Sequence, residues 1–132
     1  MSPARNEDWE SFFAAEYWRL GPETRTKLIE LLPEDWTFPG KKILDFGCGP
    51  GRTLNHFLPE AEVAEFHGVD IDAASIEKLS AESSPPLHLA VSGFEPPLDY
   101  ESETFDLIYS ISVFTHLTYN SIPWLLELHR LA

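Results

Sequence analysis

The stretch ILDFGCGPGRTL, residues 43–54, contains the pattern that decides the fold. An apolar run opens it, and three glycines follow at alternate positions, Gly47, Gly49 and Gly51. This order is typical of a buried strand that ends in a tight turn, where missing side chains let a ligand approach the backbone. Glycine turns of this kind usually hold phosphate groups. The carboxylate of Asp45, two residues before the first glycine, therefore needs an explanation.

A second carboxylate, Asp70, closes the next predicted strand, residues 65–70. An acidic residue at that place can accept hydrogen bonds from ribose hydroxyls, as in dinucleotide folds. The pyrophosphate of a dinucleotide would be repelled by Asp45, and the spacing G-x-G-x-G differs from the dinucleotide pattern G-x-G-x-x-G. A nucleoside with a cationic tail and no phosphate fits better, and S-adenosylmethionine is such a molecule.

The remainder of the chain alternates predicted strands with predicted helices. Nearly continuous apolar strands separated by helices indicate a parallel sheet that is covered on both faces. The fold class is therefore α/β, a three-layer Rossmann-like parallel sheet with N-terminal helices. The expected strands are 42–46, 65–70, 87–91 and 104–111, and the expected helices after them are 52–58, 73–82 and 121–131.

Residues 1–40 form a separate N-terminal segment in this interpretation. The sequence predicts a helix over 6–19, a break at Gly21-Pro22, and a second helix over 22–32. A linker over 33–40 then leads into the Rossmann-like domain, residues 41–132.

Composition excludes several classes of partner. Acidic residues outnumber basic ones 22 to 9, and the formal net charge is −13, so we expect neither nucleic acid nor an anionic membrane as a partner. The single cysteine, Cys48, excludes an intramolecular disulfide and favours a reducing, cytoplasmic location. No apolar run approaches the roughly 20 residues of a membrane span.

Three segments resemble the first, second and fourth motifs of the class I S-adenosylmethionine-dependent methyltransferases. They are ILDFGCGPGRTL, GVDID and FDLIYSISVFTHL, and they occur in the family's order between residues 41 and 132. The resemblance implies a sheet order of 3-2-1-4, S-adenosylmethionine as cofactor and S-adenosylhomocysteine as product. It also implies that the chain lacks the family's C-terminal strands, as if truncated after the fourth.

The resemblance also implies the cofactor-binding residues. The glycine turn would hold the methionine end and the ribose, Asp70 the ribose hydroxyls, and Ile71 the adenine. The third motif departs from the family, because Ser92, Gly93 and Phe94 stand where an acidic residue is common. Ser110, Ser112 and Val113, which follow the fourth strand, would face the cofactor. The candidates are Asp45, Gly47, Cys48, Gly49, Gly51, Asp70, Ile71, Gly93, Phe94, Ser110 and Ser112.

His116 is the candidate catalytic residue, as a general base toward the methyl acceptor. The competing interpretation is a histidine at a helix start that bonds to backbone. Methyl transfer from a sulfonium can proceed by alignment alone, so a base is not required. We expect no metal site, because His67 and Asp70 on one strand point to opposite faces, and Cys48 fits a small packing residue better than a nucleophile.

The predicted function is therefore an S-adenosylmethionine-dependent methyltransferase with a small-molecule acceptor. The alternatives are a non-catalytic fragment or scaffold that binds the cofactor or its product, and a nicotinamide-dependent oxidoreductase. Tyr17 and Trp18 are candidates for a lid over the cofactor or the acceptor. The fourth strand would be a bare apolar edge, for which we expect either a homodimer or a longer protein.

Overall fold

The computed structural model describes the chain except for residues 1–2, 85–86, 112, 115–116 and 118, and except for the side chains of residues 3–14 and 17 in the first helix. Two short 3-10 helices, η1 and η2, lie between the first two strands. The elements are α1 (Pro3–Leu31), β1 (Lys42–Phe46), η1 (Leu54–Phe57), η2 (Glu60–Glu62), β2 (Glu65–Asp70), α2 (Ala73–Glu82), β3 (His88–Val91), β4 (Leu107–Tyr109) and α3 (Ser121–Leu131).

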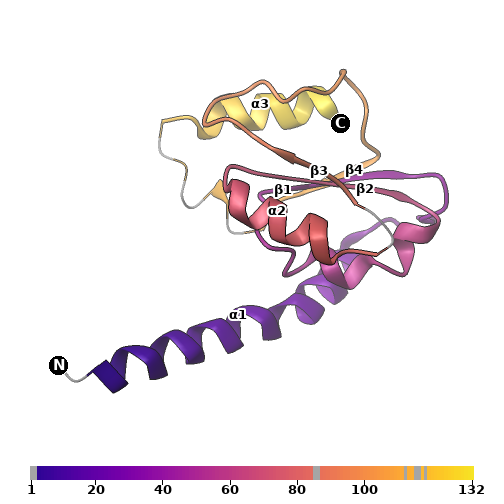
Figure 1. Ribbon diagram of the computed structural model, residues 1–132. Helices are drawn as coiled ribbons and strands as arrows, with labels where there is room; N and C mark the ends of the chain where they lie inside the picture. The colour runs from indigo at the N-terminus through magenta and orange to yellow at the C-terminus, as the bar shows by residue number, and fades with distance from the viewer. Residues whose placement is uncertain (1–2, 85–86, 112, 115–116, 118) are drawn as a thin grey trace.

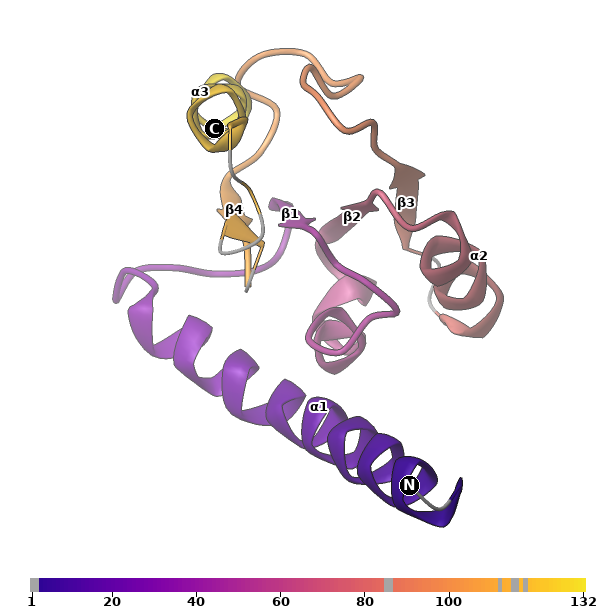
Figure 2. The same ribbon diagram turned by 90° about the vertical axis from the view of Figure 1, so that its left-hand side faces the viewer.

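The four strands form one parallel sheet in the order β3-β2-β1-β4, as predicted. β1 lies in its middle, where Ile43 is paired with Phe66 of β2 and with Leu107 of β4. Figure 2 shows α3 on one side of the sheet, α1 and the 3-10 helices on the other, and α2 beside β3. The α/β class and the layered architecture are confirmed.

Two apolar cores, one on each face, hold these layers together. Consecutive residues of β1 point to opposite faces, so Ile43 belongs to one core and Leu44 to the other. The Ile43 core includes Phe57 of η1 and Leu79 of α2, and Leu28 and Ile29 of α1 pack against it. The Leu44 core is closed by residues of α3 and of the segment before β4, namely Trp124, Leu131, Leu98 and Phe105.

The predicted break at Gly21-Pro22 is wrong, because α1 continues through Pro22 (Figure 1). Gly21 is buried against η1, and a Cβ there would lie 2.2 Å from the carbonyl oxygen of Arg52. Proline costs a helix one backbone hydrogen bond. The close packing of the helix on η1 at Gly21 offsets that cost, and it could not be read from the local sequence.

Two other elements are shorter than expected. The helix predicted over 52–58 is a single 3-10 turn, Leu54–Phe57, because the glycine turn extends to residue 53 and Pro59 follows closely. The fourth strand covers 107–109 rather than 104–111. The amides of Glu103 and Phe105 donate to the carbonyls of Arg130 and Leu131 at the end of α3, so this part of the chain follows the helix before it joins the sheet.

Within the described residues, no helix is long and apolar enough to cross a membrane.

Candidate cofactor site

A cavity of about 590 Å³ lies beyond the carboxyl ends of the strands. Its size falls within the roughly 300–1,000 Å³ of small-molecule sites, and its place is the one that open parallel sheets use for ligands. Most of the predicted cofactor residues line it: Asp45, Gly47, Cys48, Gly49, Asp70, Ile71, Gly93 and Phe94. Ser92 and Val113, also named from the sequence, line it as well.

The glycine turn is fixed to the end of β2. The amides of Gly47 and Cys48 both donate to the carbonyl of Val69, at 2.8 and 3.0 Å. Gly47 has φ +80°, and a Cβ at this position would lie 2.1 Å from Cγ2 of Val113. A side chain is therefore excluded both by backbone conformation and by space.

Asp70 organises the turn that it faces. One carboxylate oxygen accepts from the Gly49 amide at 2.7 Å, and the other accepts from the Asp72 amide at 2.9 Å. A carboxylate oxygen has two lone pairs. Asp70 therefore holds the turn in shape and keeps capacity to accept hydrogen bonds from a ligand.

Asp45 is only 3% exposed. Burial raises its pKa to about 7, and the negative charge of Asp70 adds to this effect. The neighbouring Tyr109 hydroxyl and Arg52 guanidinium oppose it. Two carboxylates at one glycine turn repel an anion and attract a cation, which explains why this turn is unsuited to phosphate.

Cys48 lines the cavity as a neutral thiol. Burial raises its pKa, and the charges of Asp45 and Asp70 raise it further. Because the thiolate is the nucleophilic form, the structure gives no support for covalent catalysis by this side chain.

Two apolar side chains at the cavity are exposed and are available for contact with a ligand. Ile71 is 58% exposed and Phe94 is 65% exposed. The carbonyl of Phe94 accepts from Nδ2 of Asn120 at 2.9 Å and from Nε1 of Trp124 at 3.2 Å. The start of α3 thus fixes the loop after β3, and the two side chains offer an apolar surface suited to a flat ring.

The other candidates are placed differently. Gly51 does not line the cavity; a Cβ there would lie 2.6 Å from Cδ1 of Leu79 in α2, so it allows close packing. Ser110 does not line it either, and its buried hydroxyl has no hydrogen-bond partner within the described part of the chain. Ser112 and His116 lie outside the described residues.

Sequence reasoning missed several residues of the cavity wall. Arg52 and Thr53 directly follow the last glycine, and that adjacency was the available signal. Trp124 lies on the buried face of the amphipathic helix 121–131, but only the fold brings that face to the cavity. The remaining missed residues are Phe46, Ile111 and Leu117.

Comparison with protein families decides the classification. The model described as "Methyltransferase domain" matches residues 44–132, more than half of the chain. This chain belongs to the methyltransferase domain family. The cofactor of this methyltransferase domain is S-adenosylmethionine, in agreement with the names of similar solved structures.

Solved structures agree on the fold of the methyltransferase domain. A TehB-like SAM-dependent methyltransferase from Corynebacterium glutamicum is 27% identical with a TM-score of 0.65, over 98% of this chain and 67% of that one. A SAM-dependent methyltransferase from Aquifex aeolicus is 18% identical with a TM-score of 0.66, over 82% and 57%. One from Mesorhizobium loti is 20% identical with a TM-score of 0.61, over 80% and 47%. The chain thus spans 47–67% of the length of these three proteins. No curated protein matches significantly.

The residues present fit the cofactor of the family. The ribose, the cationic methionine end and the adenine of S-adenosylmethionine call for hydrogen-bond acceptors, negative charge and an apolar surface. The methyltransferase domain offers the first two in Asp45 and Asp70, and the negative charge of Asp70 is close enough to raise the pKa of Asp45. It offers the third in Ile71 and Phe94.

Proposed function

We propose that the methyltransferase domain binds S-adenosylmethionine in this cavity and transfers its methyl group to a small-molecule acceptor. The observation that carries the proposal is the pair of carboxylates, Asp45 and Asp70, beside a glycine turn that is already ordered by Asp70. The formal net charge of the chain, −13, argues against nucleic acid as the acceptor.

Each residue has a distinct task in this proposal. Asp70 accepts hydrogen bonds from the ribose, Asp45 faces the cationic methionine end, and Ile71 with Phe94 contacts the adenine. When bound, S-adenosylmethionine supplies a methyl group activated by its sulfonium. The domain's own contribution is to hold the cofactor in one orientation and to shield it from water, and such alignment accounts for much of the rate in reactions of this type.

The acceptor is an O, N or C nucleophile of small size. His116 stays the predicted general base for an acceptor that must lose a proton. The lid expected in residues 1–40 also stays a prediction. Trp18 lies beside Lys78 of α2, with Nζ 5.9 Å from the ring centroid, and does not line the cavity.

Calorimetric titration with S-adenosylmethionine and S-adenosylhomocysteine tests the cofactor site. We expect low-micromolar binding that weakens at least tenfold in Asp70→Ala, about 1.4 kcal/mol. Asp35→Ala, which removes an exposed carboxylate from the linker before β1, is the matched control and should bind as the unmodified chain does. Equal affinity in all three proteins would refute the assigned role of Asp70.

A second candidate is a module that binds the cofactor without turnover, since the chain spans only 57% and 47% of two structurally similar methyltransferases. Transfer of a radiolabelled methyl group to a panel of small hydroxyl, amine and carbon acids distinguishes the two. Label in any product supports the enzyme, whereas tight cofactor binding with no transfer to any acceptor supports the binding module.

A further inference from the structure

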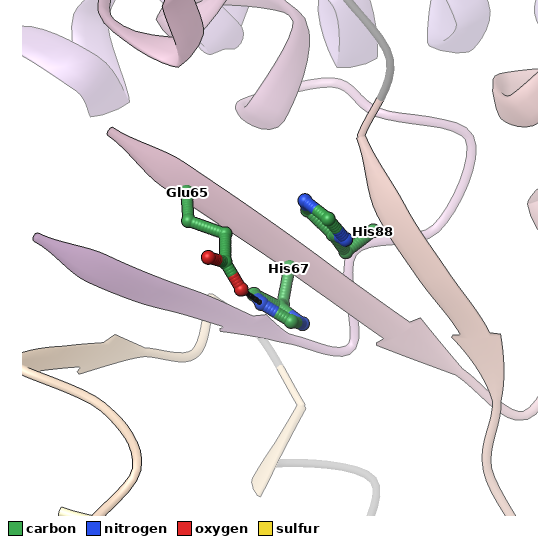
Figure 3. A group of neighbouring side chains, drawn as sticks. All are labelled: Glu65, His67 and His88. Carbon is green, nitrogen blue, oxygen red and sulfur yellow. Dashed lines mark hydrogen bonds and ion pairs between the residues drawn. The ribbon is translucent and has the colours of Figure 1, made fainter. Parts of the chain in front are cut away.

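Three side chains with metal-binding atoms meet on one face of the sheet. Glu65 and His67 are two residues apart on β2, so they point to the same side, and His88 of β3 is paired with His67 in the sheet register. Their ligand atoms all lie within 4.8 Å of one another. Figure 3 shows the Glu65 carboxylate directed at His67, with His88 on the neighbouring strand.

This group is separate from the cofactor cavity. Glu65 and His88 are the first residues of β2 and β3, whereas the cavity lies beyond the last residues of the same strands. None of the three side chains lines that cavity. An ion bound here would therefore take no part in methyl transfer.

His67 is held in the orientation that a metal ligand needs. Its Nδ1 lies 3.2 Å from the Tyr100 hydroxyl, which leaves Nε2 directed at Glu65, 2.7 Å from Oε1. Partner groups on the second ring nitrogen are the usual means of fixing a ligating imidazole.

His88 supplies the adjustable side of the group. Its ring stacks on that of His67, with centroids 4.6 Å apart, but its side chain is exposed. Bonds of about 2.0–2.1 Å in a tetrahedral site place ligand atoms roughly 3.3 Å apart. Zinc binding therefore requires the exposed His88 to turn toward the other two side chains, and Glu65 to move slightly away from Nε2 of His67.

We propose that Glu65, His67 and His88 bind one divalent ion of the zinc type, through a carboxylate oxygen and two imidazole nitrogens, with water completing the shell. Two imidazoles and one carboxylate are a ligand set that zinc accepts. Lys42 of β1, which is paired with Glu65 in the sheet and is exposed, carries a positive charge that acts on Glu65 and opposes binding of a cation. The ion would join β3, a mostly exposed strand, to the interior strand β2.

Calorimetric titration of the whole chain with zinc chloride near pH 7.5 tests this proposal. We expect one ion per chain with micromolar affinity, and at least tenfold weaker binding in His88→Ala. His129→Ala removes an exposed histidine of α3 and is the matched control, which should bind zinc normally. Affinity weaker than about 100 µM in the unmodified chain, or equal affinity in His88→Ala, would overturn the proposal.

A second variant and a second readout keep the test independent of folding. Glu65→Gln keeps an oxygen near His67 but removes the charge, and we expect it to weaken zinc binding as well. Zinc should also raise the melting temperature of the unmodified chain and not that of His88→Ala, because an ion that binds only the folded state stabilises it. Equal melting shifts in both proteins would count against the site.

Discussion

Asp45 lies at the end of β1, and its buried carboxyl has a pKa of about 7, against 3.8 in an unfolded chain. Between about pH 4 and pH 7, this carboxyl is therefore protonated in the folded state and ionised in the unfolded state. The free energy of unfolding consequently falls as the pH rises through this window, by up to about 1.4 kcal/mol per unit, and is level above it as far as this group is concerned.

Asp45→Asn should remove this pH dependence. Relative to the variant, we expect the unmodified chain to lose about 2 kcal/mol of stability between pH 5.5 and pH 7.5. Urea denaturation of both proteins at the two pH values measures the difference. Parallel changes in the two proteins would mean that Asp45 titrates at its ordinary pKa.

Cofactor binding should show the opposite trend with pH. The cationic methionine end favours the ionised form of Asp45, so a proton must leave when the cofactor binds below pH 7. We expect about fivefold weaker binding at pH 6 than at pH 7 in the unmodified chain, and little change between these values in Asp45→Asn. Calorimetry in buffers of different ionisation enthalpy also measures the proton release directly. Identical pH profiles for both proteins would place the cationic end away from Asp45.

At the scale of elements, one glycine before β1 and one in the turn after it provide a matched pair of substitutions. Gly40 and Gly47 have nearly the same φ, +78° and +80°, but a Cβ on Gly40 meets nothing within 4 Å, whereas one on Gly47 meets Val113 at 2.1 Å. Gly40→Ala should cost only the backbone penalty, about 1 kcal/mol. Gly47→Ala should cost clearly more and should abolish cofactor binding. Thermal denaturation and calorimetry measure both effects; similar losses in the two variants would contradict the crowding at Val113.

A buried acidic side chain connects α3 to the loop beside the cavity. Oε2 of Glu127 accepts from the amide of Leu98 at 2.6 Å, and the carboxylate is paired with Arg130 in the same helix. Glu127→Ala should destabilise the fold by about 2 kcal/mol, because it leaves the Leu98 amide without its acceptor, whereas Arg130 still donates to Ser102 and to the Leu98 carbonyl. Glu30→Ala, which removes an exposed partner of Lys27, should cost less than about 0.5 kcal/mol. Denaturation of both variants measures the contrast, and equal costs would refute this role.

The elements that the sequence predicted well are those whose pattern is local. The strand bounds 42–46 and 65–70 and the helix bounds 73–82 and 121–131 agree with the structure, because apolar periodicity and turn residues mark them. The errors arise where distant contacts compete with local preference. Gly21-Pro22 stays helical because the helix packs on η1. The predicted strand begins later than residue 104 because the amides of Glu103 and Phe105 bond to the end of α3.

The same distinction applies to the sites. Asp45, the glycine turn and Asp70 could be predicted, because strand ends of a parallel sheet converge and each carries a recognisable residue. The group of Glu65, His67 and His88 could not, because the register between β2 and β3 alone brings His88 to His67. Trp124 of α3 and Leu117 of the loop before it could not be predicted either, since an apolar residue does not reveal from the local sequence which cavity it will line.

At the scale of the whole molecule, β4 is an edge strand that pairs only with β1 among the described strands. Figure 2 shows α3 above this edge of the sheet, and its side chains Ile122, Leu125 and Leu126 are exposed by 68%, 54% and 65%. An unpaired edge beside an apolar helix face favours association.

We therefore predict that the isolated chain forms a homodimer through β4. Asp106 donates its amide to Lys42, so the next amide, that of Leu107, points away from β1 and toward a partner. Leu107→Pro removes that donor and should shift the protein to monomer, whereas Leu107→Val keeps it and should remain dimeric. Light scattering coupled to gel filtration measures the mass. A monomer for the unmodified chain at high concentration would refute the prediction.

The hydrogen bond from Gly49 to Asp70 makes one backbone amide a natural reporter of ligand occupancy. Exchange of that amide hydrogen with solvent requires the bond to Asp70 to open. A ligand that binds the same carboxylate stabilises the closed turn, so each opening then also costs the free energy of releasing the ligand. Protection of a single glycine amide should therefore rise with cofactor concentration. Its dependence on concentration would give the affinity of the site even if no methyl acceptor were known.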